Sequence, residues 1–182
     1  MNKTYLIALC LLTGGLSNAQ SATHTPLRFD LSRIGMVVDG KQVCNDTGNR
    51  LQDFPSKTMD QITEAGPKAV PILIGMLADD RIAKTKEPII CYWGEMTIGD
   101  IAFCLLTDLF TDSNRKTTVP GADWNGILGR NDNLPASDQL HVFVKKHGIG
   151  VLQVKWRRLW DKYRGQVFWD PKERCFEPRD SK

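Results

Sequence analysis

Histidine is scarce in this sequence, which has three: His24, His141 and His147. A catalytic zinc site takes three protein ligands. Asp138 and His141 lie three residues apart on one predicted helix, and His147 lies six residues further on and points elsewhere. His147 is more simply interpreted as a residue at a helix C-terminus, because Gly148 follows it. The sequence therefore predicts no metal site.

Other signatures of chemistry are also missing. The sequence contains no Ser-centred nucleophile motif and no Gly-rich phosphate-binding loop. Its 24 basic and 21 acidic residues give a formal net charge of +3, which does not indicate nucleic acid or an anionic membrane as a partner. We therefore predict no cofactor and no nucleic-acid partner.

The first 19 residues have the pattern of a secretory signal peptide. Lys3 precedes an apolar run over residues 5–12, and Ser17 and Ala19 occupy the minus three and minus one positions of a cleavage site. The run is shorter than the roughly 18 apolar residues that a membrane span needs. We expect residues 20–182, about 160 residues, to form one exported domain, periplasmic or extracellular, without a membrane span.

The expected mature chain contains four cysteines: Cys44, Cys91, Cys104 and Cys175. An even number in an exported chain favours disulfides, and four cysteines permit three complete pairings. Cys91 can reach Cys104, because about six extended residues span about 20 Å while the helix rises only about 10 Å over the interval. The favoured pairing is Cys91 with Cys104 and Cys44 with Cys175, and the other pairings stay open.

Local signals predict a mainly helical domain with a short hairpin near each end. The hairpin turns are expected at Asp39-Gly40 and at residues 170–173, and the rest of residues 20–55 is irregular. The predicted helices cover residues 56–66, 67–80, 97–111, 137–147 and 150–164.

Two of these helices resemble a known repeat. The segments "AGPKAVPILIGMLADD" and "TIGDIAFCLLTDLF" are similar to the helix pair of a HEAT-type repeat, over about a quarter of the mature chain. The whole chain also resembles a type of small exported bacterial protein with no assigned activity. The HEAT-like resemblance implies a helical hairpin and a binding scaffold more than a catalyst.

Two long connections, over residues 79–96 and 112–136, carry aromatic residues. Loops longer than about 12 to 15 residues are usually functional or disordered, and disordered segments are poor in aromatics. Tyr and Trp often anchor interfaces, so we predict Tyr92, Trp93 and Trp124 as binding residues. The expected partner is a protein or a component of the cell envelope.

The helix expected from Thr97 raises an alternative function. At about 100° per residue, Asp100, Cys104 and Asp108 share a narrow polar stripe opposite a broad apolar arc, so we expect Cys104 not to be buried. Glu95 with Asp100 or Asp108 offers the acid and base of a glycan hydrolase. Acidic residues at a helix N-terminus also have a simpler explanation in the helix dipole. The sequence therefore favours a non-catalytic binding protein.

The last predicted helix, in "KWRRLWDKYR", combines aromatics and cations as single-strand nucleic-acid binding proteins do. The helical angles favour another interpretation, because the apolar and cationic side chains occupy different faces. The face expected to pack on the core contains Leu152, Trp156, Leu159, Trp160 and Tyr163, and the face expected in solvent contains Arg157, Arg158 and Lys162.

Overall fold

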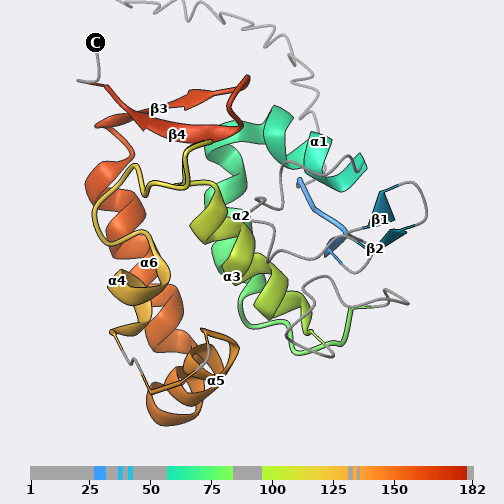
Figure 1. The fold of residues 1–182 in the computed structure, drawn as a ribbon, viewed down its shortest axis with the longest axis vertical. Helices are drawn as coiled ribbons and strands as arrows, with labels where there is room; N and C mark the ends of the chain where they lie inside the picture. The colour runs from blue at the N-terminus through green and yellow to red at the C-terminus, as the bar shows by residue number, and fades with distance from the viewer. Residues whose placement is uncertain are drawn as a thin grey trace, which may run out of the picture.

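The computed structural model describes residues 27–31, 37–38, 41–42, 57–83, 96–130, 133–134 and 136–179. This part of the chain is mainly helical, with an antiparallel hairpin near the C-terminus (Figure 1). The fold class predicted from the sequence is confirmed. The expected signal peptide lies outside the described residues, as do five of the predicted site and disulfide residues: Cys44, Cys91, Tyr92, Trp93 and Glu95.

Helix α1 (Lys57–Ala65) leads through a single 3-10 turn into α2 (Ala69–Met76). Gly66 starts the turn with φ of +51°, and a Cβ there would lie 3.1 Å from the ring of Trp169. Glycine adopts positive φ without strain, so it suits both the turn and the close approach. The apolar side chains that recur at helical spacing along α2 and its C-cap are buried: Val70, Leu73, Ile74 and Leu77.

Helix α3 (Ile98–Asp108) packs against α2. Thr97 is its N-cap and forms a capping box with Asp100, in which each side chain accepts a hydrogen bond from the other residue's backbone N–H. At Gly99 a Cβ would lie 2.5 Å from the carbonyl oxygen of Leu77. The start of α3 therefore lies directly against the end of α2, at a distance that only glycine permits.

The expectation that Cys104 is not buried is wrong. Cys104 is 4% exposed, and its neighbours on the polar stripe, Asp100 and Thr107, are 6% and 3% exposed. These groups tolerate burial because their hydrogen bonds are local: the Thr107 hydroxyl donates to the Cys104 carbonyl at 2.8 Å, and Asp100 accepts from the Thr97 N–H at 2.9 Å. The helical pattern identified the polar stripe, but it contained no information that other parts of the fold cover this stripe.

Three helices follow α3: α4 (Trp124–Leu128), α5 (Ala136–His147) and α6 (Ile149–Tyr163). Helix α4 lies in a stretch expected to be loop, and the Asp123 side chain caps it by accepting from the Gly126 N–H. The prediction for α6 is confirmed. Its aromatic face packs on the core, with Trp156 fully buried, while its cationic face is exposed: Arg157, Arg158 and Lys162.

The C-terminal hairpin pairs β3 (Val167–Asp170) with β4 (Cys175–Pro178). It forms where predicted, and the Asp170 carboxylate accepts from the backbone N–H groups of Lys172 and Glu173 inside the turn. The Phe176 N–H donates to the Leu109 carbonyl at 2.8 Å, which ties the hairpin to the end of α3. Near the N-terminus, β1 (Val37–Val38) and β2 (Lys41–Gln42) pair antiparallel, and the turn predicted at Asp39-Gly40 lies outside the described residues.

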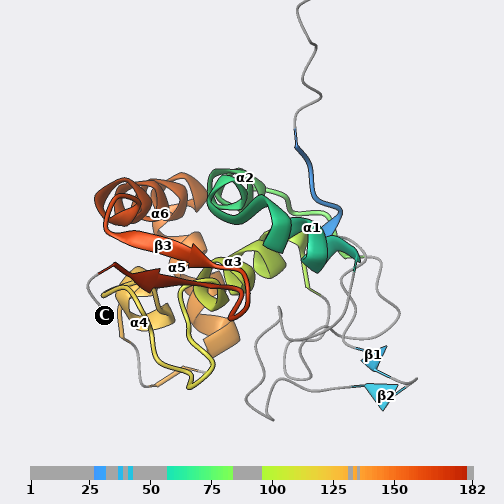
Figure 2. The same cartoon turned by 90° about the horizontal axis from the view of Figure 1, so that it is seen from above.

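The helices make a layered arrangement in which α2 and α6 lie side by side over α3 (Figure 2). The β3–β4 hairpin lies across one end of these helices and α5 lies at the other end (Figure 1). Within the described residues, no helix is long and apolar enough to cross a membrane.

Candidate functional site

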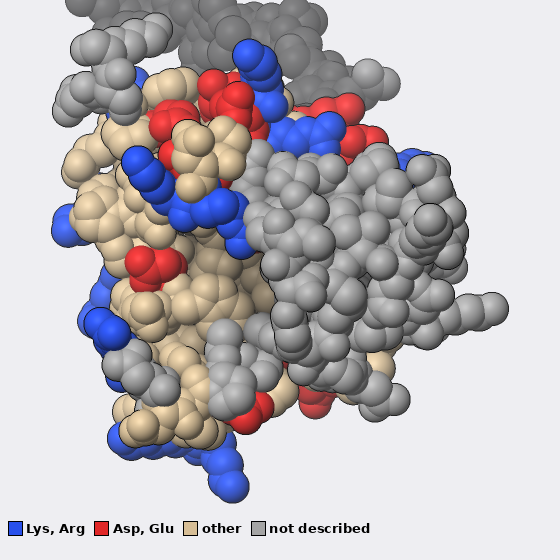
Figure 3. Space-filling model, viewed as in Figure 1, with Lys and Arg blue, Asp and Glu red and all other residues tan. Residues whose placement is uncertain are grey.

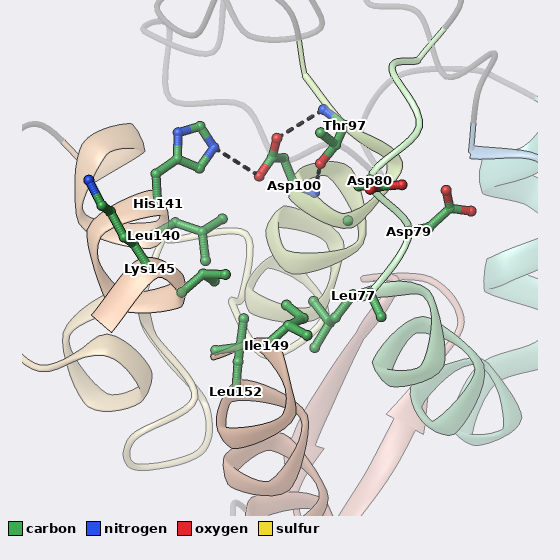
Figure 4. Close-up of a pocket in the computed structure, with 13 residues that line it drawn as sticks. Leu77, Asp79, Asp80, Thr97, Asp100, Leu140, His141, Lys145, Ile149 and Leu152 are labelled. Atoms are coloured by element: carbon green, nitrogen blue, oxygen red, sulfur yellow. Dashed lines mark hydrogen bonds and ion pairs between the residues drawn. The ribbon is translucent and has the colours of Figure 1, made fainter. Parts of the chain in front are cut away.

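A cavity of about 460 Å³ opens where the ends of four helices meet (Figure 4). The end of α2, the start of α3, the middle of α5 and the start of α6 contribute its walls. Its apolar lining consists of Leu77, Leu140, Val144, Ile149 and Leu152. Polar and charged side chains line it as well: Asp79, Asp80, Thr97, Asp100, His141 and Lys145.

Asp100 and His141 connect two walls of this cavity. The Nε2 atom of His141 lies 3.2 Å from Oδ1 of Asp100, across 41 residues of sequence. The His141 side chain is 60% exposed, whereas that of Asp100 is 8% exposed. Both carboxylate oxygens of Asp100 are therefore engaged, since Oδ2 accepts from the Thr97 N–H. The pair therefore joins α5 to the start of α3.

Sequence reasoning did not find this pair. The sequence suggested only Asp138 as a partner of His141 at a metal site, because those two residues share a predicted helix. Asp138 is exposed, and the contact of His141 is instead with a different helix. Residue spacing along one helix carries no information about which side chain another helix will present, so no local signal identified Asp100 as the partner.

A second acidic group at the cavity, Asp79, is paired with Arg81. The Arg81 Nε atom donates to Oδ1 of Asp79 at 2.8 Å, and its Nη2 atom contacts Oδ2. The hydrogen bond from Arg81 lowers the pKa of Asp79, and the same pairing raises the pKa of Arg81. The Arg81 side chain is 76% exposed, so water and salt screen this pair.

The remaining charges lie at opposite sides of the cavity. Asp80 follows the end of α2, whereas Lys145 belongs to the last turn of α5, and Figure 4 shows them on the two sides of the apolar lining. Both residues are exposed. On the described part of the face drawn in Figure 3, acidic and basic side chains are interspersed.

Cys104 lies one helical turn beyond Asp100 and does not line the cavity. Burial raises the pKa of its thiol well above the ordinary value, and the charges of Asp108 and Asp100 raise it further. Only the thiolate is a good nucleophile. The raised pKa therefore disfavours the thiolate, and with it a nucleophilic role for Cys104.

The other predicted site residues that the structure describes do not line the cavity. Trp124 is half-buried, and its ring meets that of Phe103 edge to face with centroids 4.6 Å apart, so it packs on the core. Asp108 lies two turns beyond Asp100, about 12 Å along α3. Cys175 is buried, with its Sγ atom 3.4 Å from a Glu177 carboxylate oxygen. Both disulfides stay predictions, because Cys44 and Cys91 lie outside the described residues.

The chemistry available at the cavity is therefore recognition of an apolar group beside fixed charges. Among the residues that the structure describes, no cluster of three or more His, Cys, Asp or Glu side chains is arranged to hold a metal ion. Comparison of the chain with protein-family models, with curated proteins and with solved structures finds no match.

Proposed function

We propose that this protein is an exported, non-catalytic binding module, and that its cavity holds an apolar segment of a protein partner or of a cell-envelope component. The supporting observation is the cavity itself. Its volume of about 460 Å³ falls within the roughly 300 to 1,000 Å³ of typical ligand sites, which combine an apolar lining with a few placed polar groups.

Two properties of the lining support binding. Filling the cavity removes the exposed parts of Val144 and Ile149 from water, and burial of apolar surface is favourable by about 25 cal/mol per Å². The protein's own side chains join two walls of the cavity, since His141 of α5 contacts Asp100 of α3. A preformed site loses less conformational entropy on binding.

The state of Asp100 favours binding over hydrolysis. A glycan hydrolase would pair Glu95 with Asp100 or Asp108, and its acid and base must reach the scissile bond. Asp100 is buried, and its two oxygens are engaged by Thr97 and His141. The hydrolase remains the alternative through Asp108, and loss of cell-wall glycan cleavage in Glu95→Gln, with the fold retained, is the result that would support it.

The three aromatic residues predicted to bind, Tyr92, Trp93 and Trp124, contribute less to the proposed binding than the cavity does. Trp124 packs on Phe103, so its ring supports the core next to α5 and offers only part of its surface to a partner. Tyr92 and Trp93 lie outside the described residues, and the contribution that we propose for them is additional contact with the partner. Substitution of either by alanine should weaken capture of a partner without abolishing it.

Filling the cavity tests the proposal. The wild-type protein should select peptides rich in aliphatic or aromatic residues from a random peptide array. Val144→Trp places an indole in the half-buried lining of the cavity and should weaken binding to those peptides at least tenfold.

The matched control is Val154→Trp, because Val154 is 40% exposed on α6 and does not line the cavity. It should bind like the wild type. Circular dichroism and thermal unfolding establish that both variants fold. If folded Val144→Trp binds the selected peptides as tightly as the wild type, the cavity is not the binding site.

A further inference from the structure

The charges of the cavity are separated into a negative side and a positive side. Asp79 and Asp80 lie at the end of α2, and Lys145 lies across the apolar lining on α5 (Figure 4). Arg81 pairs with Asp79, so Asp80 is the acidic group best placed to attract a cation. A ligand that fills the apolar space between the two sides will interact with the negative charge on one side and with the positive charge on the other.

The negative side also lacks donors for an anion. A helix N-terminus ordinarily binds anions through free N–H groups, and α3 begins beside Asp80. Its first four N–H groups are already used, however. They donate to the carbonyls of Arg81, Asp79 and Thr97 and to the Thr97 hydroxyl. An anionic group placed there would meet carboxylates without gaining a hydrogen bond.

The positive side is the exposed amine of Lys145, in the last turn of α5. Lys145 lies close in sequence to the start of α6, where Ile149 lines the same cavity. His141, the other basic side chain of the lining, is engaged by Asp100. Lys145 is therefore the group that can attract a carboxylate of a ligand.

On these grounds we propose that the cavity recognises an extended protein segment in which two aliphatic residues are flanked by a basic residue on one side and an acidic residue on the other. The inference rests on the proposed function and specifies the partner. A fatty acid, or any other amphiphile that carries charge of one sign only, complements the charge on only one side of the cavity. A segment with both charges matches both sides and places its aliphatic residues against Leu77, Val144 and Ile149.

The test uses three tetrapeptides with blocked ends, so that only side chains carry charge. Each has two central leucines, flanked by one lysine and one glutamate, by two lysines, or by two glutamates. Binding is followed by methyl NMR of the full-length protein at low salt, with Leu77, Val144 and Ile149 as reporters. We expect the mixed-charge peptide to bind at least fivefold more tightly than either other peptide, and this preference should shrink at 0.5 M salt, where screening acts within a few ångströms.

Charge reversal at one lining residue sharpens the test. In Lys145→Glu both sides of the cavity are negative, so the two-lysine peptide should become the tightest ligand. Lys146→Glu is the matched control, because Lys146 is the adjacent exposed residue of α5 and does not line this cavity. It should keep the wild-type order of affinities. An unchanged order in Lys145→Glu would overturn the inference.

The outcomes separate this inference from the proposed function. If all three leucine peptides bind equally and shift the reporter methyls, charge selection is wrong and the apolar binding site stands. If the two-glutamate peptide binds most tightly, the proposed charge selection is likewise wrong and the apolar binding site stands. If no leucine peptide shifts those methyls, or if a mixed-charge peptide with two serines in place of the leucines binds as well, the cavity is not an apolar recognition site and both proposals fall.

Discussion

The two ends of the helical layer are built differently. At the hairpin end, the rings of Phe110, Trp160, Trp169 and Phe176 pack together, with centroids 4.9 to 6.2 Å apart. At the cavity end, aliphatic side chains meet around an opening of about 460 Å³ with charged groups beside it. Large rings fill space and stabilise the fold, whereas short side chains at helix ends leave space that a ligand can use.

The largest expected difference between the ends is in core stability. Phe176→Ala removes a fully buried ring that stacks on Phe110, and such a truncation costs about 3 to 5 kcal/mol. Leu140→Ala at the cavity end should cost less, about 2 kcal/mol, because Leu140 already borders an open space. Urea unfolding of the two variants measures both losses.

The control for the hairpin end is Phe168→Ala, on the paired strand. Phe168 is 39% exposed, so its removal should change the free energy of unfolding by well under half the loss in Phe176→Ala. If Leu140→Ala proves as costly as Phe176→Ala, the cavity end is as tightly packed as the hairpin end and the comparison fails.

A smaller effect is expected at the contact that shapes the cavity end. Gly99→Ala places a methyl group 2.5 Å from the Leu77 carbonyl oxygen, so the start of α3 must move away from α2. We expect a loss of about 1 to 3 kcal/mol, measured by urea unfolding, together with shifts of the NMR signals of residues lining the cavity.

Gly75→Ala provides the control, because a Cβ at Gly75 in α2 meets nothing within 4 Å. Alanine favours a helix over glycine by about 0.5 to 1 kcal/mol, so this variant should be slightly more stable than the wild type. An equal effect of the two substitutions would mean that the α2–α3 approach does not determine the stability of this end.

The difference between the ends also explains which features could be predicted from sequence. Helices α1, α2, α3, α5 and α6 follow from apolar spacing and cap residues, and the capping box of Thr97 and Asp100 was visible as a local motif. These features depend on interactions within about one helical turn. The aromatic face of α6 could be assigned to the core for the same reason.

The cavity end could not be predicted in this way, because it depends on contacts between distant segments. The Asp100–His141 pair joins residues 41 positions apart, and the burial of Cys104 depends on elements that pack over α3. Helix α4 was also missed, since its five residues are too few to show a period. Its available signal was Asp123, three residues before Gly126, as an N-cap.

The smallest expected effect concerns the ion pair at the cavity end. Arg81 lowers the pKa of Asp79, so the ionised carboxylate stabilises the folded state at pH values above the pKa that Asp79 has when the chain is unfolded. That contribution is lost as the pH falls through the lowered pKa of the folded state. Asp79→Asn should therefore be slightly less stable than the wild type at pH 7, and the difference should close in acid, below the ordinary aspartate pKa of about 3.9. Urea unfolding of both proteins across this range measures the difference.

Arg81→Gln removes the same pair and should give a similar small loss at pH 7, and the double variant should lose no more than either single one. A difference that widens in acid would show that the charge of Asp79 does not stabilise this end through Arg81.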